Sequence, residues 1–236
     1  LGRLAGRGAG TRFESLAGFL PPDARNIDEL GSAVALGGSV YFADAEKILL
    51  WRDDRFSVIP HVSPPGSSGT RLHRVGDTIY VTAPGQPLGR IVGERVEAVA
   101  DDPLFRANRI VCLAAEGADL IVLTAEQGFH RLDRDGHLAP WTTGMNRWLL
   151  GKRVYCAQRL VDGSWVVGFS AVSGDGGLRV DPTGRYAGPL DTSIGLVVKT
   201  VRDFFADREG GLWLGTDEGA ARLEWPSPVS LFDSVN

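Results

Sequence analysis

Short apolar runs separated by polar turns recur along this chain. The clearest unit spans residues 200–224. It has a first strand, a tight turn at Glu209-Gly210-Gly211, a second strand through Trp213, a turn that ends at Gly219, and a third strand. Turns of this kind between short apolar runs are typical of β-hairpins. No long amphipathic helical pattern is visible, so the pattern predicts an all-β protein of short, hairpin-connected strands.

The second strand of this unit recurs as two bulky residues followed by a small one. The copies are Tyr41-Phe42-Ala43, Tyr80-Val81-Thr82, Val122-Leu123-Thr124, Val166-Val167-Gly168 and Trp213-Leu214-Gly215. Successive copies are 39, 42, 44 and 47 residues apart. A continuous apolar run is typical of a strand that is covered on both faces. We therefore expect Val122, Val166 and Trp213 to be buried between neighbouring sheets, and the small residue to let those sheets approach.

The third strand recurs in step with the second, at Gly128–Asp133, Gly176–Asp181 and Gly219–Glu224. A period near forty residues with four short strands is typical of a β-propeller blade. The sequence therefore predicts a β-propeller of four-stranded blades. Five blades are visible, at about residues 31–63, 69–100, 107–141, 152–190 and 199–234. Residues 1–30 are interpreted as an N-terminal remnant or linker, in which Thr11–Leu16 is a candidate outer strand of a preceding blade.

The segment Asp207–Gly219 resembles the repeat of the two-component regulator propeller family, through Asp-x-x-Gly followed by Leu-Trp-Leu-Gly-Thr and a later Gly. Asp162–Trp165 and Gly176–Asp181 match that repeat in part. The resemblance implies a ligand-sensing propeller in the periplasm, as part of a membrane-anchored bacterial signalling protein of the histidine kinase or diguanylate cyclase type. Sensors of that family usually have seven blades, so the five visible blades are compatible with a closed ring or with a fragment of a larger one. A homodimer of the parent protein is left open.

Composition narrows the function classes further. The net charge of −4 argues against non-specific nucleic-acid binding, which needs a basic surface. The longest apolar runs are far shorter than the roughly 20 residues of a membrane span, so we expect no direct membrane insertion. Cys112 and Cys156 are too few for a disulfide framework. They occupy the same repeat position in neighbouring blades, and we expect them to be buried free thiols.

Common catalytic signatures are absent from the sequence, among them Gly-x-Ser-x-Gly, the Walker loop, His-Glu-x-x-His and Cys-x-x-Cys. Asp133–Gly136 partly resembles a calcium loop but lacks the later acidic ligands, which favours a hairpin turn. We therefore expect no enzymatic activity, no catalytic residue, no cofactor and no metal site. A propeller lyase or glycosidase and a protein-interaction scaffold remain as alternatives.

One set of cations points to a binding site. Arg109 and Arg153 each lie thirteen residues before a second-strand copy, and Lys199 lies fourteen before Trp213. These positions begin the innermost strands, and in a propeller such starts surround one mouth of the central channel. Ion pairs with Asp101, Asp102 or Asp191 are the structural alternative for these cations.

Two tryptophans, Trp141 and Trp148, belong to a loop that is expected at the same mouth, residues 140–151. Loops held by a rigid scaffold are common sites of binding. Cations beside aromatic rings suit an anionic or sugar-like molecule. The sequence therefore predicts a small-molecule or oligosaccharide ligand, anionic ligands included, at Arg109, Arg153, Lys199, Trp148 and Trp141.

Overall fold

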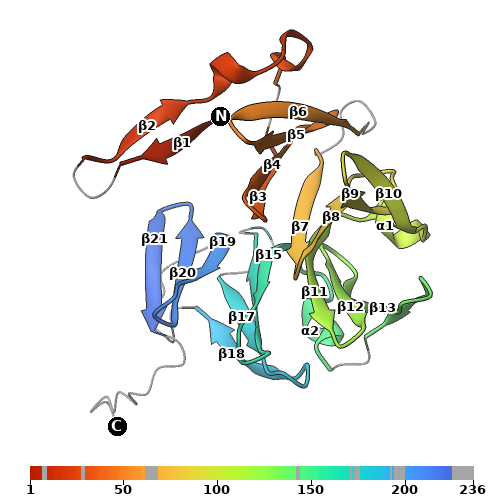
Figure 1. Ribbon diagram of the computed structural model, residues 1–236. Helices are drawn as coiled ribbons and strands as arrows, with labels where there is room; N and C mark the ends of the chain where they lie inside the picture. Colours follow the sequence, from red (N-terminus) through yellow and green to blue (C-terminus); the bar gives the residue numbers. More distant parts are fainter. Residues whose placement is uncertain are drawn as a thin grey trace. The chain divides into compact units, whose positions relative to one another are not determined.

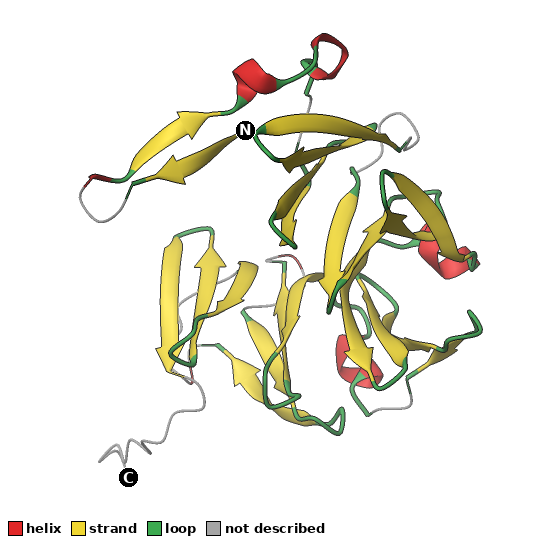
Figure 2. Ribbon diagram, in the orientation of Figure 1, coloured by secondary structure: helices red, strands yellow, loops and turns green. Residues whose placement is uncertain are grey.

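The structure, a computed structural model, is an all-β protein, and its described residues include two short α-helices (Figures 1 and 2). It describes residues 1–6, 10–27, 30–61, 69–141, 144–170, 172, 176–191, 193 and 200–224. Lys199 and the last strand expected in the fifth blade lie outside these residues. The predicted fold class is confirmed, because the chain is built of β-propeller blades. It divides into two compact units, Leu1–Ala107 and Asn108–Asn236.

The first unit contains two complete blades, each an antiparallel meander in chain order. Blade one consists of β3 (Ser32–Leu36), β4 (Ser39–Ala43), β5 (Lys47–Arg52) and β6 (Arg55–Pro60). Blade two consists of β7 (Arg71–Val75), β8 (Thr78–Thr82), β9 (Leu88–Val92) and β10 (Arg95–Ala100), and α1 (Pro103–Ala107) follows it. The two blades pack through a shared core that includes Ile48, Leu50, Leu72 and Val81.

A hairpin precedes blade one. Its strands β1 (Gly2–Ala5) and β2 (Arg12–Ser15) pair with each other, so the strand expected at Thr11–Leu16 has β1 as its partner. The segment after β2 buries Leu16, Leu20 and Ala24 against Leu49 and Phe56 of blade one. Apolar burial therefore attaches this segment to the first blade.

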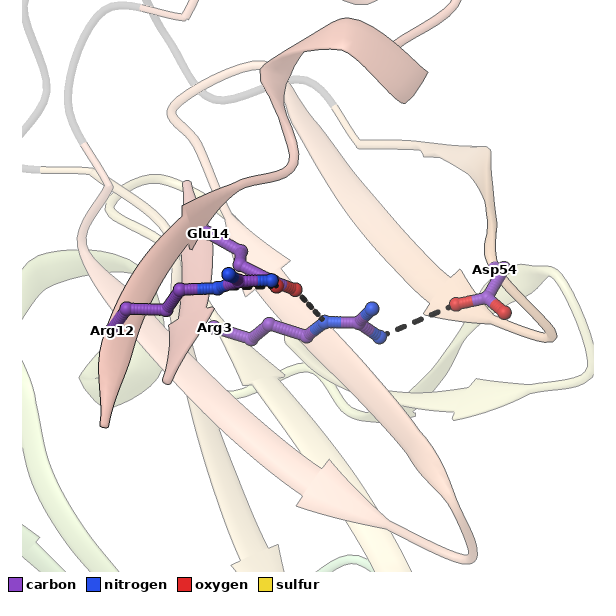
Figure 3. A network of polar contacts seen from close by, with 4 residues as sticks. All are labelled: Arg3, Arg12, Glu14 and Asp54. Atoms are coloured by element: carbon purple, nitrogen blue, oxygen red, sulfur yellow. Dashed lines mark hydrogen bonds and ion pairs between the residues drawn. The ribbon is translucent and has the colours of Figure 1, made fainter. Parts of the chain in front are cut away.

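Charged side chains add a second link between the hairpin and blade one (Figure 3). Arg3 donates to Glu14 at 3.1 Å and, from its other side, to Asp54 in the β5–β6 turn at 3.4 Å. Arg12 also donates to Glu14, at 2.9 Å. Ion pairs as exposed as these contribute little to stability, so they orient the hairpin more than they stabilise it.

The second unit contains blades three to five. Blade three consists of β11 (Ile110–Glu116), β12 (Asp119–Thr124), β13 (Gly128–Leu132) and β14 (Leu138–Pro140), and α2 (Asn146–Leu149) follows it. Blade four consists of β15 (Val154–Arg159), β16 (Trp165–Phe169), β17 (Gly177–Val180) and β18 (Tyr186–Leu190). The described strands of blade five are β19 (Val201–Ala206), β20 (Gly211–Thr216) and β21 (Gly219–Glu224).

Successive residues of β16, the second strand of blade four, pack against different neighbouring blades. In β16, Trp165 and Val167 join the core shared with blade three. Val166 points the other way and packs with Leu212 and Leu214 of blade five. Both faces of β16 are therefore covered, which explains its continuous apolar run.

The small residue in the repeat has the expected role at Gly168. A Cβ placed on Gly168 would lie 2.8 Å from Cys156 Sγ and 2.8 Å from the Cβ of Val201. Real side chains do not approach so closely, so alanine at this position would push blade five away from blade four.

The register corrects the sequence alignment of blade three by one residue. Arg131, Arg179 and Arg222 are the cross-strand partners of Ile121, Val166 and Trp213. Ile121, rather than Val122, is therefore equivalent to Val166 and Trp213. Val122 and Val166 are fully buried, as predicted.

The prediction that Trp213 is buried was wrong, because 40% of its surface is exposed. Ile121 and Val166 are covered by the following blade. Trp213 occupies the same face of β20, and the described residues of the second unit contain no blade after β21 to cover it. Its indole Nε1 instead donates to Asp207 at 2.9 Å.

Aspartates organise the tight turns. Asp133, Asp181 and Asp207 each begin a turn and accept, through Oδ1, backbone N–H groups two and four residues later. Side-chain acceptance of this kind stabilises turns locally. Asp133–Gly136 is therefore a hairpin turn, as the sequence indicated.

Asp207 carries the largest number of these contacts. Besides its turn bonds, its Oδ2 accepts from Arg222 Nε at 2.9 Å and from the Trp213 indole. The hydrogen bond from the Arg222 guanidinium, followed by those from Gly211, Trp213 and Glu209, lowers the pKa of Asp207 from 3.8 to about 2.

The register predicts unequal costs of truncation at equivalent positions. Ile121→Ala should reduce the free energy of unfolding by about 3 kcal/mol, because it opens a buried cavity. Trp213→Ala should cost less than about 2 kcal/mol, because the residue is already 40% exposed and its removal loses one hydrogen bond. Urea unfolding curves measure both values, and an equal or larger cost for Trp213→Ala would contradict the register.

The low pKa of Asp207 predicts an acid-labile contribution to stability. A carboxyl group whose pKa is lower in the folded state stabilises the fold above its unfolded pKa, and this stabilisation is lost as pH falls from about 4 towards 2. Asp207→Asn should therefore flatten the loss of stability over this range. Asp135→Asn, an exposed aspartate in the corresponding turn of blade three, is the control. Equal acid sensitivity of wild type and Asp207→Asn would refute the assignment.

Candidate functional site

Arg109 and Arg153 occupy equivalent positions just before β11 and β15. The carbonyl of Arg109 accepts from Ala125 N and that of Arg153 accepts from Ser170 N, at the same point of each blade. The Arg109 side chain is half-buried and the Arg153 side chain is exposed. The spacing argument thus placed both residues correctly along their blades, while Lys199 lies outside the described residues.

The Arg109 side chain connects blade three to blade four. Its Nη2 donates to the carbonyls of Val154 at 2.8 Å and Tyr155 at 3.3 Å. Its guanidinium carbon lies 5.3 Å from the centre of the Tyr155 ring. Through these contacts the positive charge of Arg109 interacts with groups of the protein itself, which gives Arg109 a structural role.

Arg202, which the sequence analysis did not identify, joins the same cluster from blade five. Its guanidinium lies 4.8 Å from the Tyr155 ring centre, and it donates to Tyr155 Oη at 2.7 Å. It also donates to Asp217 at 2.5 Å, which lowers the pKa of that carboxyl. Tyr155 and Arg202 both lie at register shifts in their strands. Because a bulge redirects a side chain, simple alternation could not predict this meeting.

The acids that were considered as partners for these cations are engaged elsewhere. Asp101 pairs with Arg106 at 2.7 Å. Asp102 accepts from Leu104 N and caps α1, and Asp191 accepts from Ser193 N. The cluster around Tyr155 is instead balanced by Asp217 and by backbone carbonyls.

Trp141 belongs to the core rather than to an open mouth. It is partly buried and lies edge-on to Phe129, with ring centres 5.4 Å apart. Next to it, Asn146 of α2 accepts from Phe129 N at 2.8 Å and donates to Phe129 O at 3.1 Å. This amide pairs with β13 as a neighbouring strand would, and so fixes α2 on blade three.

Trp148, on α2, forms an exposed aromatic pair with Tyr186 at the start of β18. Their rings are nearly parallel, at 13°, with centres 4.5 Å apart. Trp148 is 42% exposed and Tyr186 is 39% exposed. Large rings that are stacked yet open to solvent are typical of a recognition surface.

A shallow pocket of about 420 Å³ surrounds this pair, lined by Gly144, Arg147, Trp148, Arg185 and Tyr186. Neither Arg147 nor Arg185 forms an ion pair within the part of the chain that the structure describes. The Arg147 guanidinium lies 5.7 Å from the Trp148 ring centre. The pocket therefore offers aromatic surface and two exposed positive charges, which can hold an anion.

The predicted site residues that the structure describes lie in different surroundings: Trp141 packs against the core, Arg153 is exposed, and Arg109 and Trp148 belong to two separate groups of residues. Tyr155 and Tyr186 lie on the first and fourth strands of one sheet, so about 14 Å separates them across the sheet at about 4.8 Å per strand. The register also offsets them along the strands, because Tyr186 is aligned through Val180 and Trp165 with Arg159 rather than with Tyr155. Arg109 belongs to the inner cluster and Trp148 to the outer pocket. The inner cluster is internally satisfied, whereas the outer pocket, the Trp148–Tyr186 pocket, is open.

Two other groups of reactive residues serve the fold. Asp133, Asp135 and His137 bring potential metal-binding atoms within 4.8 Å of one another, but Asp133 already accepts hydrogen bonds from its own turn. Cys112 and Cys156 are free thiols, as expected, although Cys112 is only half-buried. Burial raises the pKa of Cys112 to about 12 and also raises that of Cys156, so neither thiol is an activated nucleophile.

Solved structures similar to this chain include two bacterial extracellular domains from B. thetaiotaomicron. One belongs to BT3049, described as a hybrid two-component system, with a TM-score of 0.68 and 12% identity over 91% of this chain and 29% of that chain. The other belongs to BT4673, described as a one-component system, with a TM-score of 0.61 and 14% identity over 90% and 29%. This chain thus spans less than a third of either relative.

A protein of unknown function from Bacteroides caccae is also similar, with a TM-score of 0.56 and 14% identity over 80% of this chain and 70% of that chain. At such identities the similarity shows the propeller fold alone. No protein-family model and no curated protein sequence matches the chain. Among the described residues, none of the helices has the length and apolar character needed to cross a membrane.

The contacts of Arg109 predict a structural penalty. Arg109→Gln should lower the free energy of unfolding by about 2 kcal/mol, because it removes charged hydrogen bonds between two blades. Arg134→Gln, an exposed arginine in a turn of blade three, removes the same charge and should change stability by at most about 0.5 kcal/mol. Equal effects of the two variants in urea unfolding would show that Arg109 does not connect the blades.

Proposed function

We propose that this chain is a non-catalytic, ligand-sensing propeller domain in the periplasm, part of a membrane-anchored signalling protein of the histidine kinase or diguanylate cyclase type. The observation that carries the proposal is a structural similarity. It extends over 91% of the chain and relates it to an extracellular domain described as part of a hybrid two-component system. The resemblance of Asp207–Gly219 to the two-component regulator propeller repeat supports it independently.

The Trp148–Tyr186 pocket supports a binding role. Its two rings and two arginines are exposed, and they are held by β18 and by a helix that Asn146 fixes to β13. A preformed surface of this kind binds a ligand with little ordering cost. In a sensor, the ligand shifts the balance between two poses of the domain or of a dimer of the parent protein.

The chemistry of the pocket favours binding over hydrolysis. A glycosidase needs two carboxyl groups on either side of the scissile bond. The residues that line the Trp148–Tyr186 pocket provide aromatic rings, two guanidinium groups and a glycine. This set can hold and orient an anion, but it contains no carboxyl group and so lacks the acid pair of a glycosidase.

The proposal predicts that the isolated chain binds a small molecule and returns it unchanged. A thermal-shift screen against sugars, sugar acids and small organic acids should show a concentration-dependent rise in Tm for at least one compound. Mass spectrometry of that compound after overnight incubation separates the outcomes. An unchanged compound supports a sensor and a converted one supports an enzyme. The absence of any stabilising compound at millimolar concentration would contradict ligand sensing by this domain.

A further inference from the structure

We propose that the Trp148–Tyr186 pocket binds a small carboxylate whose acid group is attached to a flat aromatic ring. This inference rests on the proposed function, because it assigns a chemical class and a place to the ligand that such a domain would sense. It follows from the stacked rings, the two arginines and the position of the pocket at the outer edge of blade four.

The stacked rings select for a flat partner. Trp148 and Tyr186 lie nearly parallel, and their partial exposure leaves ring surface open to the pocket. A third planar ring can continue such a stack in the offset geometry that aromatic groups prefer. Because both rings are already ordered by their mutual contact, a ligand does not have to immobilise them.

The arginines select for a negative charge. Arg147 is adjacent to Trp148 in α2, and Arg185 is adjacent to Tyr186, so each ring has a guanidinium beside it in the chain. A guanidinium presents paired donors that match the two oxygens of a carboxylate. Asp181 modifies the field near Arg185: its pKa is lowered first by a backbone hydrogen bond from Arg185 and also by the Arg185 charge. No ion pair joins these two side chains, so the fork of Arg185 remains available to a ligand.

The combination is more selective than either part alone. A neutral ring would stack but leave both arginines solvated, and acetate would pair with an arginine but contact no ring. A uronic acid presents the carboxylate on a puckered ring, which stacks less completely than a planar one. Benzoate is the smallest probe that satisfies both requirements, and the pocket, at about 420 Å³, has room for larger relatives.

The test measures the affinity of the full chain for four probes by isothermal titration calorimetry: benzoate, benzamide, cyclohexanecarboxylate and galacturonate. Benzoate should bind, and the other three should bind at least about tenfold more weakly, because each lacks the charge or the flat ring. Trp148→Ala and Arg185→Gln should each weaken benzoate binding by about tenfold or more. The matched controls are Phe205→Ala, an exposed ring on blade five, and Arg134→Gln, an exposed arginine on blade three. Both controls should leave the affinity unchanged.

Several outcomes would overturn the inference, and they differ from failure of the proposed function. Tighter binding of galacturonate than of benzoate would show that the ligand is a sugar acid rather than an aromatic carboxylate. Unchanged benzoate affinity in both Trp148→Ala and Arg185→Gln would place the site elsewhere. In either case the domain still binds a ligand, and the proposed function stands. If no probe binds while the broader screen finds another ligand, only the ligand class is wrong. If neither finds a ligand, both proposals fail.

Discussion

Blade four buries both faces of its sheet against different neighbours, and most features of the second unit follow from that constraint. In β16, Trp165 and Val167 serve the contact with blade three, and Val166 serves the contact with blade five. The close approach of blades four and five then requires Gly168, whose missing side chain leaves room for Cys156 and Val201. Arg109 can connect two blades only because their inner strands begin side by side.

The same constraint explains where binding surface arises. In blade three the outer strand β14 is only three residues long, and Asn146 of α2 completes the pairing with β13. A helix used in this way buries Leu149 in the core and leaves Trp148 exposed at its surface. Tyr186, at the start of the outer strand of blade four, then stacks on Trp148. The pocket is therefore a product of a short outer strand and its helical replacement, rather than of the inner strands on which the spacing argument focused.

The fold could be predicted from the sequence because propeller blades repeat, so strands assigned in one blade can be checked against the equivalent positions of the others. Spacing located the second strand of all five blades and the third strand of blades three to five, while the register of blade three was displaced by one residue, from Ile121 to Val122. Burial of Trp213 was predicted incorrectly, because the repeat describes a blade with neighbours on both sides. The site was harder to predict. Register shifts bring Arg202 to Tyr155, and the Trp148–Tyr186 contact joins two elements that no sequence period relates.

The most direct test of the central claim, that the Trp148–Tyr186 pocket is where this domain binds its ligand, is an NMR titration that follows the indole N–H signals. The chain has six tryptophans, so each signal can be assigned by single substitution to phenylalanine. On addition of benzoate, the account predicts a large, saturable shift of the Trp148 signal. The signals of Trp165, which is buried, and of Trp213, which is on blade five, should not shift. A saturable shift of another indole with Trp148 unmoved would contradict it.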